Sequence, residues 1–396
     1  MNRLVVRAYN VGFGEAILVT VPDKSNKTGK ETIRHILFDV GNLAVGAGSG
    51  YRVFEPVVKD ILKRIGRKSV DLYIMTHEHY DHVTGLYDAH KRYGLGVNLD
   101  YAWLTASSAT GYYARHPAAR RRRDLIDAHY RGVVRYLATT KEKQAKALKH
   151  LMKNNDPKRT RTRVQFLKSA GGASKHTTYV HAAKRLKRKI HHSFEEARLT
   201  VLAPEEDTAC YPLGLMPLPL MMGSDSITGG RNKPYESAVP KPPNGVDPKA
   251  FARLLQRRKR GLATDILAID KAANNTSIVL MLEWRGWRLL FTGDAEEASW
   301  IMMERQKRAL KPVHFLKVSH HGSINGTPDD SILESILPIN PTDSRERTAL
   351  VSTCPGTHFG DIPHGQTLKR LAQRGVTVRS TTEVSRGKAV EISFEA

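Results

Sequence analysis

The stretch THEHYDHVTG, residues Thr76–Gly85, directly follows an apolar run typical of a β-strand. It places His77, His79, Asp81 and His82 in an H-x-H-x-D-H pattern. Residues two apart in extended chain point the same way, so His77 and His79 could hold one metal ion while Asp81 and His82 face a second. Four ligand-type residues within six positions predict a metal site rather than a polar loop. Imidazole and carboxylate together suit zinc, manganese or iron, and no thiolate lies nearby.

Two later strand ends add further ligand-type residues. RLLFTGDAEE delivers Asp294 after an apolar strand and a Thr-Gly turn, and FLKVSHHGS delivers His320 and His321 after another. An isolated aspartate at such a position is often only a helix N-cap, and Asp294 could serve the helix that follows it. The joint occurrence of these residues, each just after a strand, favours a shared metal site.

Short apolar strands punctuated by glycine dominate both ends of the chain, with amphipathic helical stretches between them. This order predicts an α/β (α+β) protein in which two sheets pack together with helices outside. The expected strands are RLVVRAYNVG, EAILVTV, HILFDVGN and DLYIMTH in the first part, and SIVLMLEW, WRLLFTGD, HFLKVSHHG and TALVSTC in the second.

The charge of the chain is strongly basic and unevenly distributed. The formal net charge is +24. Residues 113–190 hold 23 Lys or Arg against 4 Asp or Glu, which is 23 − 4 = +19. A field of this size attracts polyanions, above all nucleic acid. We expect a basic, mainly helical insertion over 106–198, with Arg120, Arg121, Arg122 and Arg123 contacting nucleic acid; the alternative is a solvated helix pair with basic outer faces.

Proline marks a second insertion. Residues 204–248 contain 9 of the 19 prolines, a density that excludes regular helix or central strand. We expect a Pro/Gly-rich loop over 204–265 within one domain that spans 1–396.

The two cysteines lie too far apart in sequence for a disulfide framework. No apolar run is long enough to cross a membrane and no signal peptide is recognisable, so we expect a cytoplasmic protein.

The motifs together resemble those of the metallo-β-lactamase superfamily of metallohydrolases. The resemblance rests on FDVGN with Asp39, HEHYDH, FTGD and VSHHGS. VGFGEAILV, NNTSIVLML and VSTCPGTHFGDIPHGQTLKRL are similar to the β-lactamase-like domain of ComEC DNA-uptake proteins and its free-standing relatives. The resemblance covers residues 1–105 and 199–396. It implies a four-layer αββα sandwich with a dinuclear metal centre at one sheet edge.

The resemblance also implies roles for individual residues. His77 and His79 would hold one ion, Asp81 and His82 the other, Asp294 would bridge them, and His321 or His320, with His321 favoured, would complete the second site. Asp39 would not bind metal itself but would fix the tautomer of a metal ligand. The family usually adds a third histidine to the first ion. His116, His176, His181, His191 and His192 are available in this chain, but none has a matching context.

Two divalent ions, with zinc favoured over manganese or iron, would activate water as hydroxide for hydrolysis. The basic insertion favours a nuclease or phosphodiesterase acting on DNA or RNA, because a phosphodiester stays anionic through its transition state. Alternatives are a hydrolase of small esters, thioesters or lactones, and a nucleic-acid-binding protein with a degenerate metal site. His358 and His364 are candidates to protonate a leaving oxygen, or ordinary turn residues, and Asp81 belongs to the catalytic set. The sequence leaves protein partners unknown.

Overall fold

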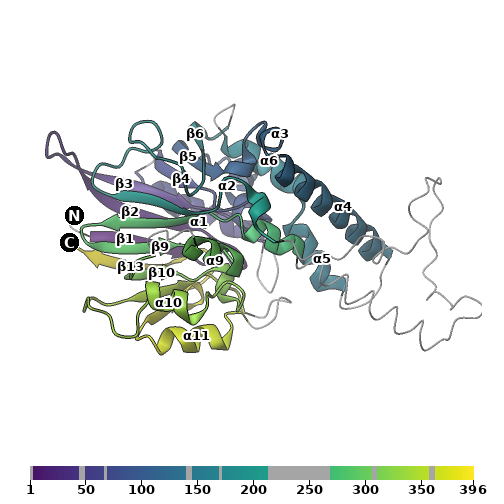
Figure 1. Ribbon diagram of the computed structural model, residues 1–396. Coiled ribbons are helices and arrows are strands. Elements are labelled where there is room, and N and C mark those ends of the chain that lie inside the picture. Colours follow the sequence, from purple (N-terminus) through teal and green to yellow (C-terminus); the bar gives the residue numbers. More distant parts are fainter. Residues whose placement is uncertain are drawn as a thin grey trace, which may run out of the picture.

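The computed structural model describes residues 3–43, 50–66, 69–139, 145–168, 172–212, 268–305, 310–355 and 362–396. Strands and helices are interspersed along this part of the chain (Figure 1). The strands are β1 Arg3–Tyr9, β2 Ile17–Lys24, β3 Glu31–Phe38, β4 Val70–Ile74, β5 Leu99–Thr105, β6 Ser174–Val180, β7 Arg198–Ala203, β8 Val279–Trp284, β9 Trp287–Phe291, β10 Phe315–Lys317, β11 Thr348–Val351, β12 Thr377–Ser380 and β13 Ala389–Glu395. The helices are α1 Phe54–Arg64, α2 Tyr80–Tyr93, α3 Tyr112–Arg115, α4 Pro117–Thr139, α5 Ala145–Asn154, α6 Pro157–Leu167, α9 Glu297–Arg305, α10 Asp330–Ile336 and α11 Gly365–Ala372.

The strands form two mixed sheets. The first has the order β13-β1-β2-β3-β4-β5-β6 and the second β12-β11-β10-β9-β8-β7. Pairing is antiparallel from β13 to β3 and parallel from β3 to β6. The second sheet is parallel from β12 to β9 and antiparallel from β9 to β7. Parallel neighbours align their carboxyl ends at one edge, where ligand sites tend to form.

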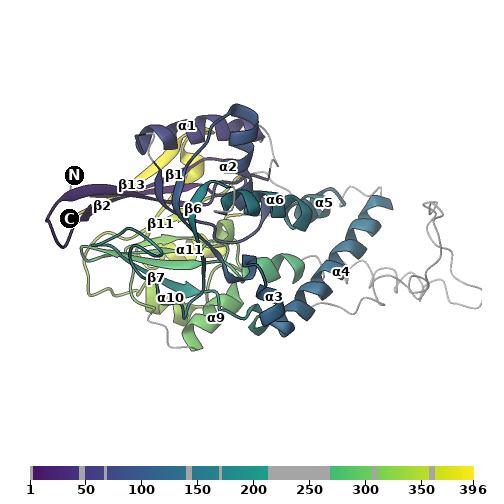
Figure 2. The ribbon, with the colours of Figure 1, turned by 90° about the horizontal axis from the view of Figure 1, so that it is seen from above.

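Three apolar clusters hold four layers together. The central cluster joins the facing sides of the two sheets, with Phe38 stacked on Phe291 at a ring-centroid distance of 4.3 Å. A second cluster packs α1, α2 and α6 on the outer face of the first sheet, and a third packs α9, α10 and α11 on the second (Figures 1 and 2). The chain is therefore an αββα sandwich, as the sequence predicts.

The basic segment 106–198 contains helices α3 to α6 and then returns to the sheet. Strand β6 pairs in parallel with β5 and forms one edge of the first sheet, so the helical part ends at Leu167 and the last third of the segment belongs to the sandwich. Figure 2 shows α4 extending away from the sheets. Most of the expected Pro/Gly-rich loop, residues 213–265, lies outside the described residues. Among the described helices, none is long and apolar enough to cross a membrane.

Candidate metal centre

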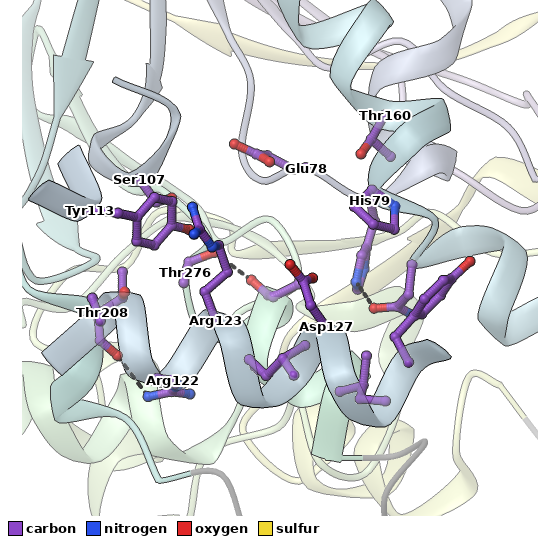
Figure 3. A pocket seen from close by; sticks show the side chains of 18 residues that line it. Glu78, His79, Ser107, Tyr113, Arg122, Arg123, Asp127, Thr160, Thr208 and Thr276 are labelled. Atoms are coloured by element: carbon purple, nitrogen blue, oxygen red, sulfur yellow. Dashed lines mark hydrogen bonds between the residues drawn. The ribbon is translucent and has the colours of Figure 1, made fainter. Parts of the chain in front are cut away.

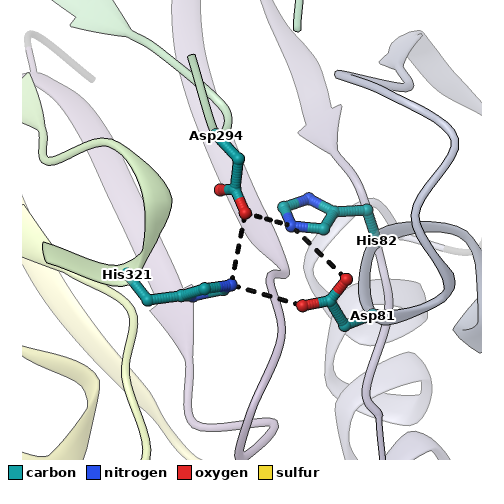
Figure 4. Close-up of side chains that lie close together, drawn as sticks. All are labelled: Asp81, His82, Asp294 and His321. Atoms are coloured by element: carbon teal, nitrogen blue, oxygen red, sulfur yellow. Dashed lines mark hydrogen bonds and ion pairs between the residues drawn. The ribbon is translucent and has the colours of Figure 1, made fainter. Parts of the chain in front are cut away.

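Four ligand-type side chains from three separate parts of the chain converge at the carboxyl-end edge of the sandwich. Asp81, His82, Asp294 and His321 each place one ligand atom within 4.8 Å of the others, and all four are buried (Figure 4). Asp81 and His82 lie in the first turn of α2, directly after the loop that follows β4. Asp294 follows β9, and His321 follows β10. The fold thus assembles residues that are more than 200 positions apart.

The distances within the group are those of hydrogen bonds and ion pairs. The Nε2 atom of His82 lies 3.2 Å from Oδ2 of Asp294, and Nε2 of His321 lies 3.3 Å from Oδ2 of Asp81. His321 also lies 3.4 Å from Asp294. Each imidazole therefore turns its Nε2 atom toward the carboxylates. This is the orientation that metal coordination through Nε2 requires.

The opposite nitrogen of each imidazole is held by a partner outside the group. Nδ1 of His82 lies 2.8 Å from Oδ2 of Asp39, and Nδ1 of His321 lies 2.9 Å from the carbonyl oxygen of Ser352. Asp39 also accepts hydrogen bonds from the backbone N–H and the hydroxyl of Thr76, at 2.8 and 2.6 Å. Partners of this kind fix the tautomer and orientation of a ligating histidine.

The group is charged, and its members shift one another's pKa values. Burial alone would lower the pKa of His321, but the carboxylates of Asp294 and Asp81 raise it to about 10. Burial would raise the pKa of Asp294, but His321 and His82 hold it well below its ordinary value. Two carboxylates and two protonated imidazoles therefore neutralise one another. A divalent cation could replace the two protons, since metal ligands must be deprotonated.

Lys317 and Glu15 form a buried pair beside this group that no sequence motif predicted. Nζ of Lys317 lies 2.7 Å from Oε2 of Glu15 and 3.6 Å from Oδ1 of Asp294, and both residues of the pair are at most 2% exposed. The lysine stands in the otherwise apolar FLKV just before His320 and His321. A charged residue inside a buried strand can be recognised in the sequence. It predicts a counter-charge nearby, because a buried charge is costly without one.

His77 and His79 lie next to the group without joining it. The ring centroid of His77 is 4.2 Å from that of His82 and 4.6 Å from that of His79. Nδ1 of His77 contacts the Thr76 hydroxyl at 3.1 Å, and its Nε2 atom is buried with no hydrogen-bond partner among the described residues. Nε2 of His79 lies 2.9 Å from Oδ1 of Asn155.

The basic helices contribute directly to the histidine loop. Asn154 and Asn155 lie at the junction of α5 and α6, and Oδ1 of Asn154 accepts a hydrogen bond from the backbone N–H of Asp81 at 3.0 Å. Asn155 contacts His79 and also donates to Oδ1 of Asp270 at 2.7 Å. No sequence pattern predicts these contacts, because two asparagines in a basic helical segment resemble ordinary capping residues.

His320 belongs to a separate group. It shares a second possible cation position with Asp270 and Glu296, whose ligand atoms also lie within 4.8 Å of one another. The five other histidines that could complete the first ion, at positions 116, 176, 181, 191 and 192, are in neither group.

A cavity of about 170 Å³ lies between the histidine loop and α4. Figure 3 shows Glu78 and His79 on one side, and Arg122, Arg123 and Asp127 of α4 on the other. The cavity contains both acidic and basic side chains, so its electrostatic character is mixed. It places α4 next to His79 of the histidine loop.

The four consecutive arginines of α4 have different surroundings. Arg120 and Arg121 are exposed. Arg122 donates a hydrogen bond to the carbonyl oxygen of Thr208 at 2.7 Å, and burial lowers its pKa. The guanidinium of Arg123 lies 4.0 Å from the ring centroid of Tyr113. Two of the predicted nucleic-acid contacts are thus available to solvent, while Arg122 is engaged within the protein.

Of the two histidines proposed for proton transfer, His364 is described by the structure and belongs to neither group. His364 is the N-cap of α11, and its Nδ1 atom accepts a hydrogen bond from the backbone N–H of Gln366 at 3.3 Å. This contact matches the alternative interpretation as a polar turn residue. His358 lies outside the described residues.

The donor atoms present fit a divalent cation. Oδ1 of Asp81, Oδ1 of Asp294 and Nε2 of His77 are buried and have no hydrogen-bond partner among the described residues. Buried polar atoms are normally satisfied, so unsatisfied ones at a single place indicate a missing partner. Mixed carboxylate and imidazole donors match zinc, manganese and iron.

No family model and no curated protein sequence matches the chain. Solved structures similar to it include a diphosphatase from the PhnP family, which is 11% identical and aligns over 99% of this chain and 98% of that chain with a TM-score of 0.35. Another is Zn²⁺-bound PqqB from Methylobacterium extorquens, which is 12% identical and aligns over 95% of this chain and 86% of that chain with a TM-score of 0.32.

Proposed function

We propose that this protein is a metal-dependent hydrolase of the metallo-β-lactamase superfamily that cleaves phosphodiester bonds in DNA or RNA. The observation that carries the proposal is the buried convergence of Asp81, His82, Asp294 and His321 at one edge of an αββα sandwich. Convergence of this kind from three chain segments is costly without a cation, because it concentrates buried charge.

The residues of the proposed centre have separable tasks. Asp81, His82, Asp294 and His321 would hold one divalent ion, and His77 and His79 would face a second. Bound divalent ions would activate water and polarise the attacked group. Asp39 orients His82 through the 2.8 Å contact. Lys317 lies 3.6 Å from Asp294; burial would lower the pKa of this lysine, but the carboxylates of Glu15 and Asp294 raise it, so the lysine stays positively charged.

The charge distribution supports a polyanionic substrate. Arg120 and Arg121 are exposed on α4, and α4 also lines the cavity beside His79. A phosphodiester passing along this helix would meet cationic side chains before it reached the metal centre. Contacts of this type attract the backbone without reading base sequence.

The cavity favours a second candidate function, the hydrolysis of small esters, thioesters or lactones. Its volume of about 170 Å³ is small even beside the roughly 300 to 1,000 Å³ of most small-molecule sites, so only a compact substrate could occupy it. A compact ester would fit there, whereas a folded nucleic acid would reach the centre only with an end or a single strand.

The test is an assay of the purified full chain with Mn²⁺ or Zn²⁺ on single- and double-stranded DNA and RNA and on p-nitrophenyl esters. The double variant Asp81→Ala, His82→Ala should abolish cleavage. A matched control is His314→Gln, which alters a buried histidine paired with Asp343 at 2.8 Å before β10, away from the carboxyl-end edge. This control should retain activity.

The outcomes separate the candidates. Cleavage of nucleic acid by the parent and the control, but not by the double variant, supports the phosphodiesterase. Ester turnover without nucleic-acid cleavage supports the small-ester hydrolase. Binding of nucleic acid without any turnover would contradict both and indicate a binding protein.

A further inference from the structure

A second group of ligand-type residues lies beside the proposed centre and is not explained by it. Asp270, Glu296 and His320 place their ligand atoms within 4.8 Å of one another. Glu296 and His320 come from the same two strand ends that supply Asp294 and His321. Asp270 comes from the helical segment 268–274. The two groups therefore share two chain segments: Asp294 and Glu296 follow one strand, and His320 and His321 follow another.

The second group concentrates negative charge in a buried place. Asp270 is 6% exposed and Glu296 is 2% exposed. Nδ1 of His320 lies 3.1 Å from Oε1 of Glu296, and Nε2 of His79 lies 3.7 Å from Oδ1 of Asp270. Two buried carboxylates are costly unless a positive charge compensates them. Imidazoles at the border supply part of this compensation, and a divalent cation would supply the rest.

A buried amide provides an independent indication. Asn274 is fully buried, and its Nδ2 atom donates to Oε1 of Glu296 at 2.8 Å and to Oδ2 of Asp270 at 3.3 Å. Its Oδ1 atom is buried with no hydrogen-bond partner among the described residues. Rotation of this amide by half a turn would present the unsatisfied oxygen to the space between the carboxylates. A cation there would favour that orientation, because an amide oxygen is a good ligand for hard cations.

We propose that Asp270, Glu296 and His320, with the side-chain oxygen of Asn274, hold the second divalent cation of the proposed centre, the one that His77 and His79 face. Two carboxylates, one imidazole and one amide oxygen suit Mn²⁺ or Zn²⁺. This ligand set explains why no third histidine is recognisable in the sequence: acidic residues take its place. The inference rests on the proposed metal-dependent function but not on the choice of substrate.

The test is the metal content of the full chain after equilibration with Mn²⁺ or Zn²⁺ and removal of free metal, measured by inductively coupled plasma mass spectrometry. The wild type should bind two equivalents. The double variant Asp270→Asn, Glu296→Gln should bind one, which Asp81 and Asp294 still hold. The matched control is Asp88→Asn, another buried carboxylate, whose partner is Arg163 at 3.2 Å; it should bind two.

The proposal is overturned if the double variant binds as many equivalents as the wild type. If that variant does not fold, His320→Gln replaces it, because the side chain of His320 is 22% exposed and tolerates change. This variant should bind the second equivalent at least tenfold more weakly than the wild type and bind the first with unchanged affinity. If it binds both equivalents with wild-type affinity, the proposal is also overturned. Two bound equivalents in a protein that cleaves no phosphodiester would refute the proposed function and leave this site standing.

Discussion

The Nε2 atom of His79 lies 2.9 Å from the Oδ1 atom of Asn155, so the basic helical segment directly contacts the histidine loop. Asn155 also donates to Oδ1 of Asp270, which links the same amide to the second group. The helices of the basic segment are thus part of the structure around the proposed centre and not only a charged surface.

Asn155→Ala should destabilise the metal-free protein by about 1 to 3 kcal/mol, because it leaves buried polar atoms of His79 and Asp270 without a partner. Added Zn²⁺ should reduce this difference, since a cation would satisfy both atoms. Urea denaturation with and without Zn²⁺ measures the effect. A loss of stability that is unchanged by metal would show that Asn155 acts only within the helices.

Asp39→Asn should lower metal affinity by about 10- to 100-fold, because the amide cannot replace the carboxylate that orients Nδ1 of His82. Competition with a chromophoric chelator measures the affinity. Asp60→Asn is a suitable control, since Asp60 accepts a hydrogen bond from the Tyr9 hydroxyl at 2.9 Å outside the two ligand groups. Equal losses in the two variants would contradict a specific role for Asp39.

Gly41→Ala should impair the centre through the backbone. A Cβ atom at Gly41 would lie 2.2 Å from the carbonyl oxygen of Asp81 and 2.4 Å from the backbone nitrogen of His82. Neither atom can move without displacing the ligands, so we expect a loss of about 1 to 3 kcal/mol in stability together with weaker metal binding. Gly50→Ala, where a Cβ would meet nothing within 4 Å, should change neither quantity in calorimetric measurements.

Arg120→Gln, Arg121→Gln should weaken nucleic-acid binding and lower the slope of log affinity against log salt by about 2, because each exposed arginine releases about one counterion. Arg122→Gln should instead lower stability, because its guanidinium donates to the Thr208 carbonyl. Fluorescence anisotropy over a range of salt concentrations tests the first effect and thermal unfolding the second. An unchanged slope in the double variant would refute the nucleic-acid contact.

His192 should make the protein less stable in mild acid. Burial lowers the pKa of His192 from 6.5 to about 4. The unfolded chain therefore binds a proton between these values that the folded chain does not, and stability falls as pH decreases from about 6.5 to about 4.

His192→Gln should remove up to about 3 kcal/mol of this decrease, measured by denaturant unfolding at pH 7, 5.5 and 4.5. The exposed His176 offers the control His176→Gln, which should keep the wild-type pH dependence. Identical pH profiles in wild type and His192→Gln would contradict this assignment.

The pattern of apolar strands predicted β1 to β4 of the first sheet and β8 to β11 of the second, with helices outside them. It also located Asp81, His82, Asp294 and His321, because ligand-type residues that follow strands are brought together when those strands run parallel in adjacent sheets. Strands β5, β6, β7, β12 and β13 were not expected; β6, for example, is mostly polar and lies in basic sequence. A strand at the edge of a sheet needs less apolar character than a central one, so its pattern is weak.

The sequence by itself determined the layered architecture and one set of ligand-type residues, because periodic burial and residue type at strand ends are local properties of the chain. Only the tertiary structure decided that Asn155 contacts His79, that Lys317 neutralises Glu15, and that Asp270 joins Glu296 and His320. These relationships depend on how segments far apart in the sequence pack against one another, and such packing leaves no periodic signal in the sequence.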